Sequence, residues 1–213
     1  MPLSQPLPER LRPSELALFV GQSHLAERLT TLMDAPRLPS LLLFGPPGCG
    51  KSTLALLLAK ARGGNVLRLS APEAGLQQLR RQLTGVDILV LDELHRFSKA
   101  QQDFFLPLLE SGDLTMIATT TENPSFEVNG ALLSRCKVFV LEALTPAQVT
   151  AVLRRALADE RGFGGQGVQI DGECLSMIAA FANGDARTAL GTLEMAVLNG
   201  GPAKVAVVSS ALC

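Results

Sequence analysis

The sequence predicts an α/β fold in which a parallel-sheet core is followed by a small all-helical domain. Five short apolar runs alternate with helical patterns up to about residue 142, as strands and helices do in a parallel sheet. A glycine-rich loop joins the first strand directly to a helix, which is typical of the same class of fold. After residue 143 only helical patterns follow, so we expect the chain to divide there.

Composition limits the classes of protein to which the chain can belong. A net charge of −1 over 213 residues excludes a polybasic protein, so any contact with nucleic acid must come from a local patch. No apolar run approaches the roughly 20 residues that cross a bilayer, so we expect no membrane partner. The four cysteines fit no metal motif and no small disulfide framework, which favours a reducing, cytoplasmic location.

Each element of the core follows from a local pattern. The first 15 residues contain four prolines and are expected to form an extended arm. Residues 23–34 place leucines on one helical face behind Ser23, which is a candidate N-cap. Strands are expected at residues 41–44, 66–69, 87–91, 114–119 and 137–141, and helices at 53–62, 74–83, 100–109 and 130–134.

The loop after the first strand matches the phosphate-binding pattern G-x-x-x-x-G-K-[ST] in full. Its glycines let backbone N–H groups turn toward phosphate oxygens. Lys51 can reach the β- and γ-phosphates of a nucleotide, and Ser52 offers a hydroxyl ligand to Mg²⁺. ATP and Mg²⁺ are therefore the predicted cofactors. The predicted nucleotide contacts in and after the loop are Gly45, Pro46, Pro47, Gly48, Cys49, Gly50, Lys51, Ser52 and Thr53.

Two neighbouring carboxylates follow the apolar run at residues 88–91. Asp92 and Glu93 would lie at the carboxyl edge of the sheet, where open α/β sheets bind their ligands. Asp92 can join the Mg²⁺ shell, and Glu93 can polarise a water for attack on a phosphate. A carboxylate that activates water favours a hydrolase over a kinase that acts on a bound hydroxyl.

The patterns divide the chain into three parts. Residues 1–142 are expected to form the nucleotide-binding core, and residues 143–200 a helical lid domain. The lid is expected to contain helices at residues 146–161, 172–183 and 185–198, with no good strand between them. Residues 201–213 are small and apolar and form a tail that these patterns do not place.

At this point the chain resembles one branch of the AAA+ ATPases. Residues 91–97 read LDELHRF, residues 99–103 KAQQD, residues 120–126 TTENPSF and residues 132–136 LLSRC. This series is similar to the family of RarA, the replication-associated recombination protein, whose relatives include the Werner helicase-interacting ATPase and clamp-loader subunits. The resemblance runs from about residue 12 to residue 198.

The resemblance implies roles for further residues. Thr120 looks like the polar sensor 1 that orients the attacking water, with Thr119 and Thr121 as alternatives in register. Arg135 looks like the arginine finger, which would reach the γ-phosphate held by a neighbouring subunit. Arg187 looks like sensor 2, which projects from the lid to the same phosphate.

Two other positions have weaker assignments. Residues 19–22, which read FVGQ, match the family's stretch near the adenine, with Val20 and Gly21 as the candidate contacts. A plain hydrophobic anchor explains the stretch nearly as well. His95 lies two residues after Glu93, as in DExH helicases, but the other helicase motifs are not found. We therefore expect His95 to support the site or the fold.

The resemblance also implies partners. These are a neighbouring copy of the chain, reached through Arg135, and DNA with single-strand, fork or gap character, with single-strand-binding protein as a candidate helper. Family members form tetramers through a helical domain that this sequence lacks, so we expect weaker assembly. The segment between Ser70 and Asp87 is shorter than in typical relatives, which puts in doubt the contact that its longer form would make.

Three rival interpretations stay open on the sequence. A clamp-loader subunit would share the same chemistry. A nucleotide-binding switch or structural subunit would bind without hydrolysis, although Lys51, Asp92, Glu93 and Arg135 argue against it. A small-molecule kinase would share the phosphate loop but would need neither the arginine finger nor the lid.

Overall fold

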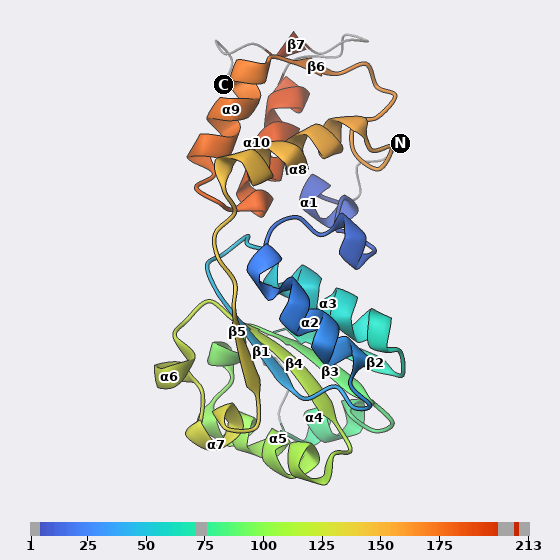
Figure 1. The fold of residues 1–213 in the computed structure, drawn as a ribbon, viewed down its shortest axis with the longest axis vertical. Helices are drawn as coiled ribbons and strands as arrows, with labels where there is room; N and C mark the ends of the chain where they lie inside the picture. Colours follow the sequence, from blue (N-terminus) through green and yellow to red (C-terminus); the bar gives the residue numbers. More distant parts are fainter. Residues whose placement is uncertain (1–4, 71–75, 200–206, 209–213) are drawn as a thin grey trace.

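The structure of the protein is a computed structural model that describes residues 5–70, 76–199 and 207–208 (Figure 1). Five parallel strands form one sheet in the order β2-β3-β4-β1-β5. They are β1 (Leu41–Phe44), β2 (Val66–Ser70), β3 (Ile88–Asp92), β4 (Thr115–Thr120) and β5 (Lys137–Val140). Each strand begins and ends within one residue of its expected bounds, and the predicted fold class is confirmed.

Helices cover both faces of this sheet (Figure 1). One face carries α2 (Ala26–Asp34) and α3 (Lys51–Arg62), and the other carries α4 (Leu76–Gln82) and α5 (Lys99–Ser111). Two short helices lead from β4 to β5, namely α6 (Pro124–Glu127) and α7 (Gly130–Leu133). The sequence patterns predict α7 but not α6, because α6 is a single turn that begins at a proline behind the capping side chain of Asn123.

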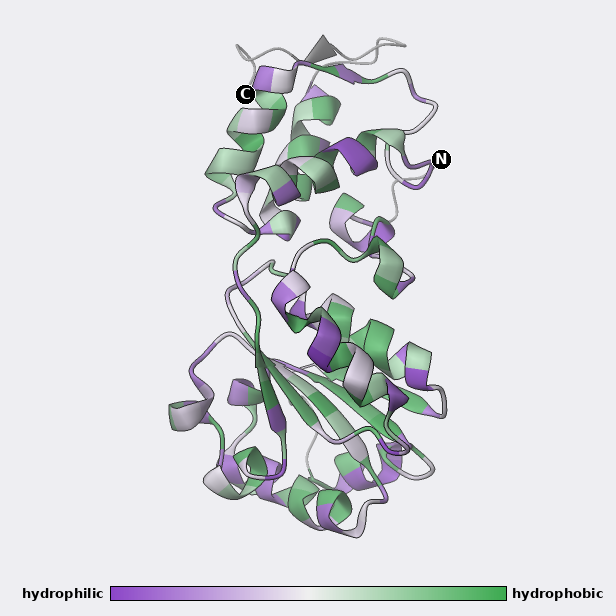
Figure 2. Ribbon diagram, viewed as in Figure 1, coloured by the Kyte–Doolittle hydropathy of each residue, from purple (hydrophilic) through white to green (hydrophobic). Residues whose placement is uncertain are grey.

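The central strands are apolar on both faces because helices bury both faces. Leu41 and Leu43 pack with residues of α3, whereas Leu42 packs on the opposite face with Phe105 of α5. All three leucines of β1 are fully buried. Figure 2 shows the same feature as strongly hydrophobic colour along the middle of the sheet. Such doubly buried strands read as continuous apolar runs, which is why their bounds could be predicted so closely.

The helical lid has a hydrophobic core of its own. It contains α8 (Pro146–Ala158), α9 (Gly172–Phe181) and α10 (Ala186–Asn199), whose apolar faces meet around Leu153 and Leu193. A pair of two-residue strands, β6 (Gln169–Ile170) and β7 (Val207–Val208), lies at the end of the lid (Figure 1). The expectation of no strand in the lid was therefore wrong, because a pairing this short leaves no pattern in the sequence.

The expectation of an extended N-terminal arm was also wrong. Residues Leu7–Arg10 form a helical turn, α1, in which Leu7 is fully buried in the core of the lid. The backbone N–H of Leu7 and the guanidinium of Arg10 both donate to Glu194 of α10, at 2.9 and 3.1 Å. Proline is tolerated in the first turn of a helix, so the prolines before and after Leu7 do not prevent it. The start of the chain therefore packs with the lid, and the boundaries at 142 and 200 stay predictions.

The structure also bears on three further expectations, which concern Ser23, the C-terminal tail and the cysteines. Ser23 does not cap a helix; it begins a 3-10 turn, Ser23–Leu25, that precedes α2. The predicted tail at 201–213 lies outside the described residues except for β7. Cys49 and Cys136 carry free thiols, as expected for a reducing environment, whereas Cys174 is disulfide-bonded, which that expectation did not include. In the described part of the chain, no helix combines the length and the apolar character needed to cross a membrane.

Candidate nucleotide-binding site

The phosphate loop connects the end of β1 to the start of α3, as its sequence predicts. Gly48 and Gly50 adopt positive φ angles of 64° and 101°, a region that favours glycine. A Cβ atom at Gly48 would lie 1.8 Å from Oδ1 of Asp185, and one at Gly50 would lie 2.8 Å from the ring of Phe19. Glycine is therefore required at both positions by backbone conformation and by close approach of the lid and the N-terminal segment.

Lys51 folds back over its own loop. Its Nζ donates hydrogen bonds to the carbonyl oxygens of Gly45 and Pro46, at 2.9 and 2.7 Å, and the residue is only 6% exposed. Burial lowers the pKa of Lys51, because a charged ammonium loses solvation there. Burial likewise raises the pKa of the Cys49 thiol. The loop thus holds a positive charge at its centre, beside backbone carbonyls that a phosphate could displace.

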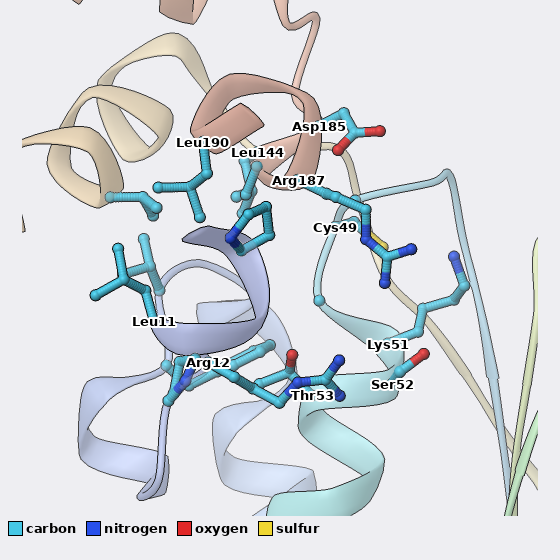
Figure 3. Close-up of a pocket in the computed structure, with 18 of the residues that line it drawn as sticks. Leu11, Arg12, Cys49, Lys51, Ser52, Thr53, Leu144, Asp185, Arg187 and Leu190 are labelled. Atoms are coloured by element: carbon cyan, nitrogen blue, oxygen red, sulfur yellow. The ribbon is translucent and has the colours of Figure 1, made fainter. Parts of the chain in front are cut away.

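A single pocket joins the loop to the lid and to the N-terminal segment (Figure 3). Leu11 and Arg12 line it from the start of the chain, and Arg187 and Leu190 line it from α10. The loop contributes Pro47, Gly48, Cys49, Gly50, Lys51, Ser52 and Thr53. Of the other predicted adenine contacts, Val20 lies in the lining and Gly21 does not.

The residues present fit a nucleotide with Mg²⁺. The first N–H groups of α3 have no partner inside the helix, and they lie at its positive end. The hydroxyl-bearing Ser52 follows Lys51 in the pocket lining. No cluster of three His, Cys, Asp or Glu side chains in the described residues forms a complete metal site. Mg²⁺ is usually held by one or two protein oxygens together with substrate phosphates, and Ser52 and Asp92 offer such oxygens.

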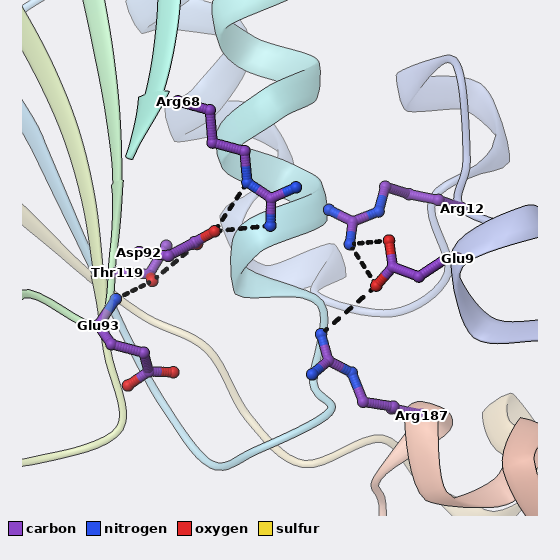
Figure 4. Close-up of polar contacts among 7 residues, drawn as sticks. All are labelled: Glu9, Arg12, Arg68, Asp92, Glu93, Thr119 and Arg187. Carbon is purple, nitrogen blue, oxygen red and sulfur yellow. Dashed lines mark hydrogen bonds and ion pairs between the residues drawn. The ribbon is translucent and has the colours of Figure 1, made fainter. Parts of the chain in front are cut away.

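Asp92 is the last residue of β3, and both of its carboxylate oxygens are hydrogen-bonded (Figure 4). Oδ2 accepts from Nε and Nη2 of Arg68 at 2.9 and 2.7 Å, and Oδ1 accepts from the hydroxyl of Thr119 at 3.2 Å. The Asp92 side chain is 7% exposed, and that of Arg68 is 42% exposed. Arg68 comes from the neighbouring strand β2 and was not predicted as a site residue. The sequence feature that could have identified Arg68 is its position as a charged residue inside the otherwise apolar run of β2.

Glu93 leaves the sheet with an unusual backbone. Its φ is +56°, the left-handed region that non-glycine residues enter at a cost of about 1–3 kcal/mol and that is enriched at functional sites. The side chain is 34% exposed and lines the pocket with Lys51. Its Oε2 accepts from the hydroxyl of Thr121 at 3.4 Å and lies 3.3 Å from Nδ1 of His95.

The three threonines at the end of β4 face different neighbours. Thr119 donates to Asp92 and accepts from the backbone N–H of Glu93 at 3.2 Å, and Thr121 donates to Glu93. The hydroxyl of Thr120 lies 3.1 Å from Nδ1 of His95 and donates to the backbone of Glu122, so it is not hydrogen-bonded to the carboxylate of Asp92 or Glu93. Alternation of side chains along a strand gives Thr119 and Thr121 the same side and Thr120 the other. The water-orienting role of Thr120 stays a prediction.

The lid contacts the phosphate loop directly. The backbone N–H of Ala186, at the start of α10, donates to the carbonyl oxygen of Gly48 at 3.2 Å. Arg187 extends from the same turn into the pocket and is 68% exposed (Figure 3). Its guanidinium lies 3.9 Å from the carboxylate of Glu9, which also pairs with Arg12 at 2.7 Å (Figure 4). The structure therefore brings Arg187 to the site, as the sequence predicts.

Arg135 lies elsewhere. It follows α7, and it donates to the carbonyl oxygen of Ala131 at 2.7 Å and pairs with Glu110 of α5. It is absent from the lining of the pocket in its own chain.

Gly21 has a structural role of its own, because a Cβ there would lie 2.6 Å from Leu144 of the lid. The neighbouring Gln22, from the same stretch, is buried; its side-chain amide donates to the carbonyl oxygen of Glu142 at 2.7 Å and accepts from the N–H of Glu142 at 2.9 Å.

Comparisons with known proteins identify a family model and several named relatives of this chain. The family model described as the Holliday junction DNA helicase RuvB P-loop domain matches residues 11–136. Replication-associated recombination protein A of Escherichia coli K12 is 45% identical over 90% of this chain and 46% of its own length. ATPase WRNIP1 of Dictyostelium discoideum is 42% identical over 90% of this chain and 23% of its own length. The chain thus spans less than half the length of these relatives.

A solved structure has the same fold. The Thermotoga maritima RuvB Holliday junction branch migration motor superposes with a TM-score of 0.80 at 27% identity, over 95% of this chain and 70% of that one. The family model covers more than half of the chain. The two relatives carry the names of the RarA and Werner helicase-interacting ATPase families, which the motifs of this chain resemble. The chain therefore belongs to the AAA+ P-loop ATPases, in the family of the RuvB P-loop domain, with RarA and WRNIP1 among its relatives.

Proposed function

We propose that this chain binds ATP and Mg²⁺ between its sheet core and its lid, hydrolyses the ATP, and uses the resulting lid motion on DNA. The observation that carries this proposal is the pocket itself, in which Lys51, Glu93 and Arg187 converge from the loop, the sheet edge and the lid. A lysine and an arginine suited to phosphate, together with a carboxylate suited to water activation, are the groups that hydrolysis of a nucleotide requires. A small-molecule kinase would need neither the Arg135 finger nor the helical lid, and a screen of acceptor molecules separates it from a hydrolase.

Each side chain has a role that follows from its position. Lys51 and the first N–H groups of α3 would bind phosphate oxygens, and Ser52 and Asp92 would hold the metal, Asp92 while it accepts from Thr119. Glu93 accepts a proton from a water on the pocket side of the sheet edge. When bound, Mg-ATP supplies the phosphoryl group that is transferred and the metal charge that offsets its oxygens. Arg187 contributes positive charge from the lid.

Arg135 acts in a neighbouring copy of the chain. It is absent from the lining of its own pocket, yet it is held at the surface by Ala131 and Glu110. A guanidinium presented in this way suits transition-state stabilisation in trans, which is worth about 10³–10⁵-fold in related phosphoryl transfers. Self-association is therefore part of the proposed activity.

DNA is the proposed partner on which nucleotide-driven motion acts. The relatives are named for replication-associated recombination, and the structural neighbour is a Holliday junction branch migration motor. We propose DNA with fork or gap character, with single-strand-binding protein as a helper, in a cytoplasmic location. A clamp-loader subunit is the rival function with the same chemistry. The preference of the protein for branched or for gapped DNA separates the two functions.

The test is ATP hydrolysis per subunit against protein concentration, with and without forked or gapped DNA. We expect the rate per subunit to rise with concentration and with DNA. Glu93→Gln and Arg135→Ala should each reduce hydrolysis by at least about 10²-fold. Arg154→Ala is the matched control, since Arg154 is an exposed arginine of α8 outside the pocket lining. Tight ATP binding without hydrolysis would favour the switch, and a flat rate that Arg135→Ala leaves unchanged would exclude the shared site.

A further inference from the structure

His95 occupies a position between two residues of the proposed site. It lies in the 3-10 turn Leu94–Arg96, directly after Glu93, and its side chain is 17% exposed. Its Nδ1 lies 3.1 Å from the hydroxyl of Thr120 and 3.3 Å from Oε2 of Glu93. One ring nitrogen therefore faces both the end of β4 and the carboxylate that follows β3.

The chemistry of the neighbours decides which ring nitrogen carries the proton. An ionised carboxylate 3.3 Å from Nδ1 favours the tautomer of a neutral His95 that carries its hydrogen on Nδ1, because a nitrogen lone pair there would face the negative charge of Glu93. The Thr120 hydroxyl can donate to the carbonyl oxygen of Glu122 at 3.3 Å, and it accepts from the N–H of Glu122 at 3.1 Å. The Thr120 oxygen is thus free to accept from His95 as well. With the hydrogen on Nδ1, His95 donates to the Thr120 hydroxyl at 3.1 Å and places the same N–H dipole 3.3 Å from Oε2 of Glu93.

We propose that His95 is a positioning residue for Glu93, and that its Nδ1–H couples the orientation of the Glu93 carboxylate to Thr120. This inference rests on the proposed hydrolysis, in which Glu93 takes a proton from water. Among the residues that the structure describes, the only side-chain hydrogen bond to this carboxylate is the 3.4 Å contact from Thr121. Without His95, a one-third exposed glutamate would sample other rotamers, and a displacement of 1 Å can cost about 10²-fold in rate.

A set of three substitutions tests the position of the donor. His95→Asn keeps an N–H donor at the place of Nδ1, His95→Gln moves it to the place of Nε2, and His95→Ala removes it. We expect His95→Ala to lower kcat by about 10–100-fold while the KM for ATP changes by less than about twofold. His95→Asn should recover most of kcat, and His95→Gln should not. Equal activity of the Asn and Gln variants, or wild-type kcat in His95→Ala, would overturn the proposal.

A second readout needs no nucleotide. The chain has two histidines, and the Nε2 of His24 lies 3.1 Å from the carbonyl oxygen of Val140. Because a carbonyl only accepts, His24 should carry its proton on Nε2, the opposite of His95. Nitrogen-15 NMR of the imidazoles in mildly alkaline buffer reads both tautomers, and His24→Gln assigns the signals. Protonation of His95 on Nε2 instead of Nδ1 would refute the geometry, even if a variant failed to fold.

Glu93→Gln separates this inference from the proposed function. If Glu93→Gln hydrolyses ATP at the wild-type rate, Glu93 is not the base and the proposed function fails, whatever the tautomer of His95. If Glu93→Gln is inactive while His95→Ala matches the wild type, the positioning role alone fails. Binding of a fluorescent ATP analogue should be unchanged within about twofold in His95→Ala, since Lys51 and the loop are untouched.

Discussion

Replacing Arg68 with methionine would remove the guanidinium that holds Asp92 while keeping an apolar stem of similar length. The pair has two N–H···O contacts, at 2.9 and 2.7 Å, between a 7% exposed carboxylate and a 42% exposed guanidinium. An exposed ion pair is worth about 0–1 kcal/mol. Breaking a fully buried pair costs about 3–5 kcal/mol. The half-exposed arginine places Arg68→Met between these limits, at about 2 kcal/mol.

Thermal unfolding measures this loss of stability. A second measurement with Mg²⁺ and ATP tests whether the loss comes from the unbalanced charge of Asp92. For a chain of this size about 2 kcal/mol corresponds to a fall in Tm of about 4–8 °C. We expect most of that fall to disappear with saturating Mg²⁺ and ATP, because the bound cation then balances the charge of Asp92. The double variant Arg68→Met with Asp92→Asn should be more stable than the sum of the single effects predicts.

The matched control is Arg154→Met, which removes an exposed arginine from α8. It should leave Tm unchanged within about 1 °C in both conditions. The reasoning would be refuted if Arg68→Met had the Tm of the wild type. It would also be refuted if the fall in Tm were the same with and without Mg²⁺ and ATP.

Two further predictions follow from contacts already described. Gly48→Ala places a Cβ against Asp185 at a positive φ, so ATP binding should fall by at least about tenfold in a fluorescence titration. Gly191→Ala, in open space on α10, should instead raise the free energy of unfolding by about 0.5–1 kcal/mol. Arg161 lowers the pKa of Asp159 to about 2 from 3.8, so Asp159→Asn should destabilise the lid near neutral pH. That effect should fade as the pH falls from about 4 to 2, and a pH-independent effect would contradict it.

The sequence predicted the parts of the molecule that depend on local patterns. The five strands were found because each is buried on both faces, and the loop from Gly45 to Ser52 was found because its pattern is specific. The helix α1 was missed because prolines surround Leu7, and its packing against the lid joins residues far apart in the chain. The role of Arg135 depends on a neighbouring copy of the chain, so that assignment stays a prediction.

Contacts between strands could not be predicted in the same way. Which of Thr119, Thr120 and Thr121 faces a carboxylate depends on where β4 ends relative to β3, a register that no local pattern reveals. The pairing of Arg68 with Asp92 likewise needs the order of strands in the sheet. The residue types of the site were therefore predictable, but the hydrogen bonds between them were not.

The packing of α1 against the lid has a mechanical consequence. The polypeptide crosses between lid and sheet twice, once from α1 toward the turn Leu16–Leu18 beside α3, and once from β5 toward α8 (Figure 1). A body attached at one point can swivel in any direction, whereas a body attached at two points turns only about the line that joins them. The two connections thus define one rotation axis for the lid. A change at the pocket that moves the lid would rotate it about that axis, in one fixed direction.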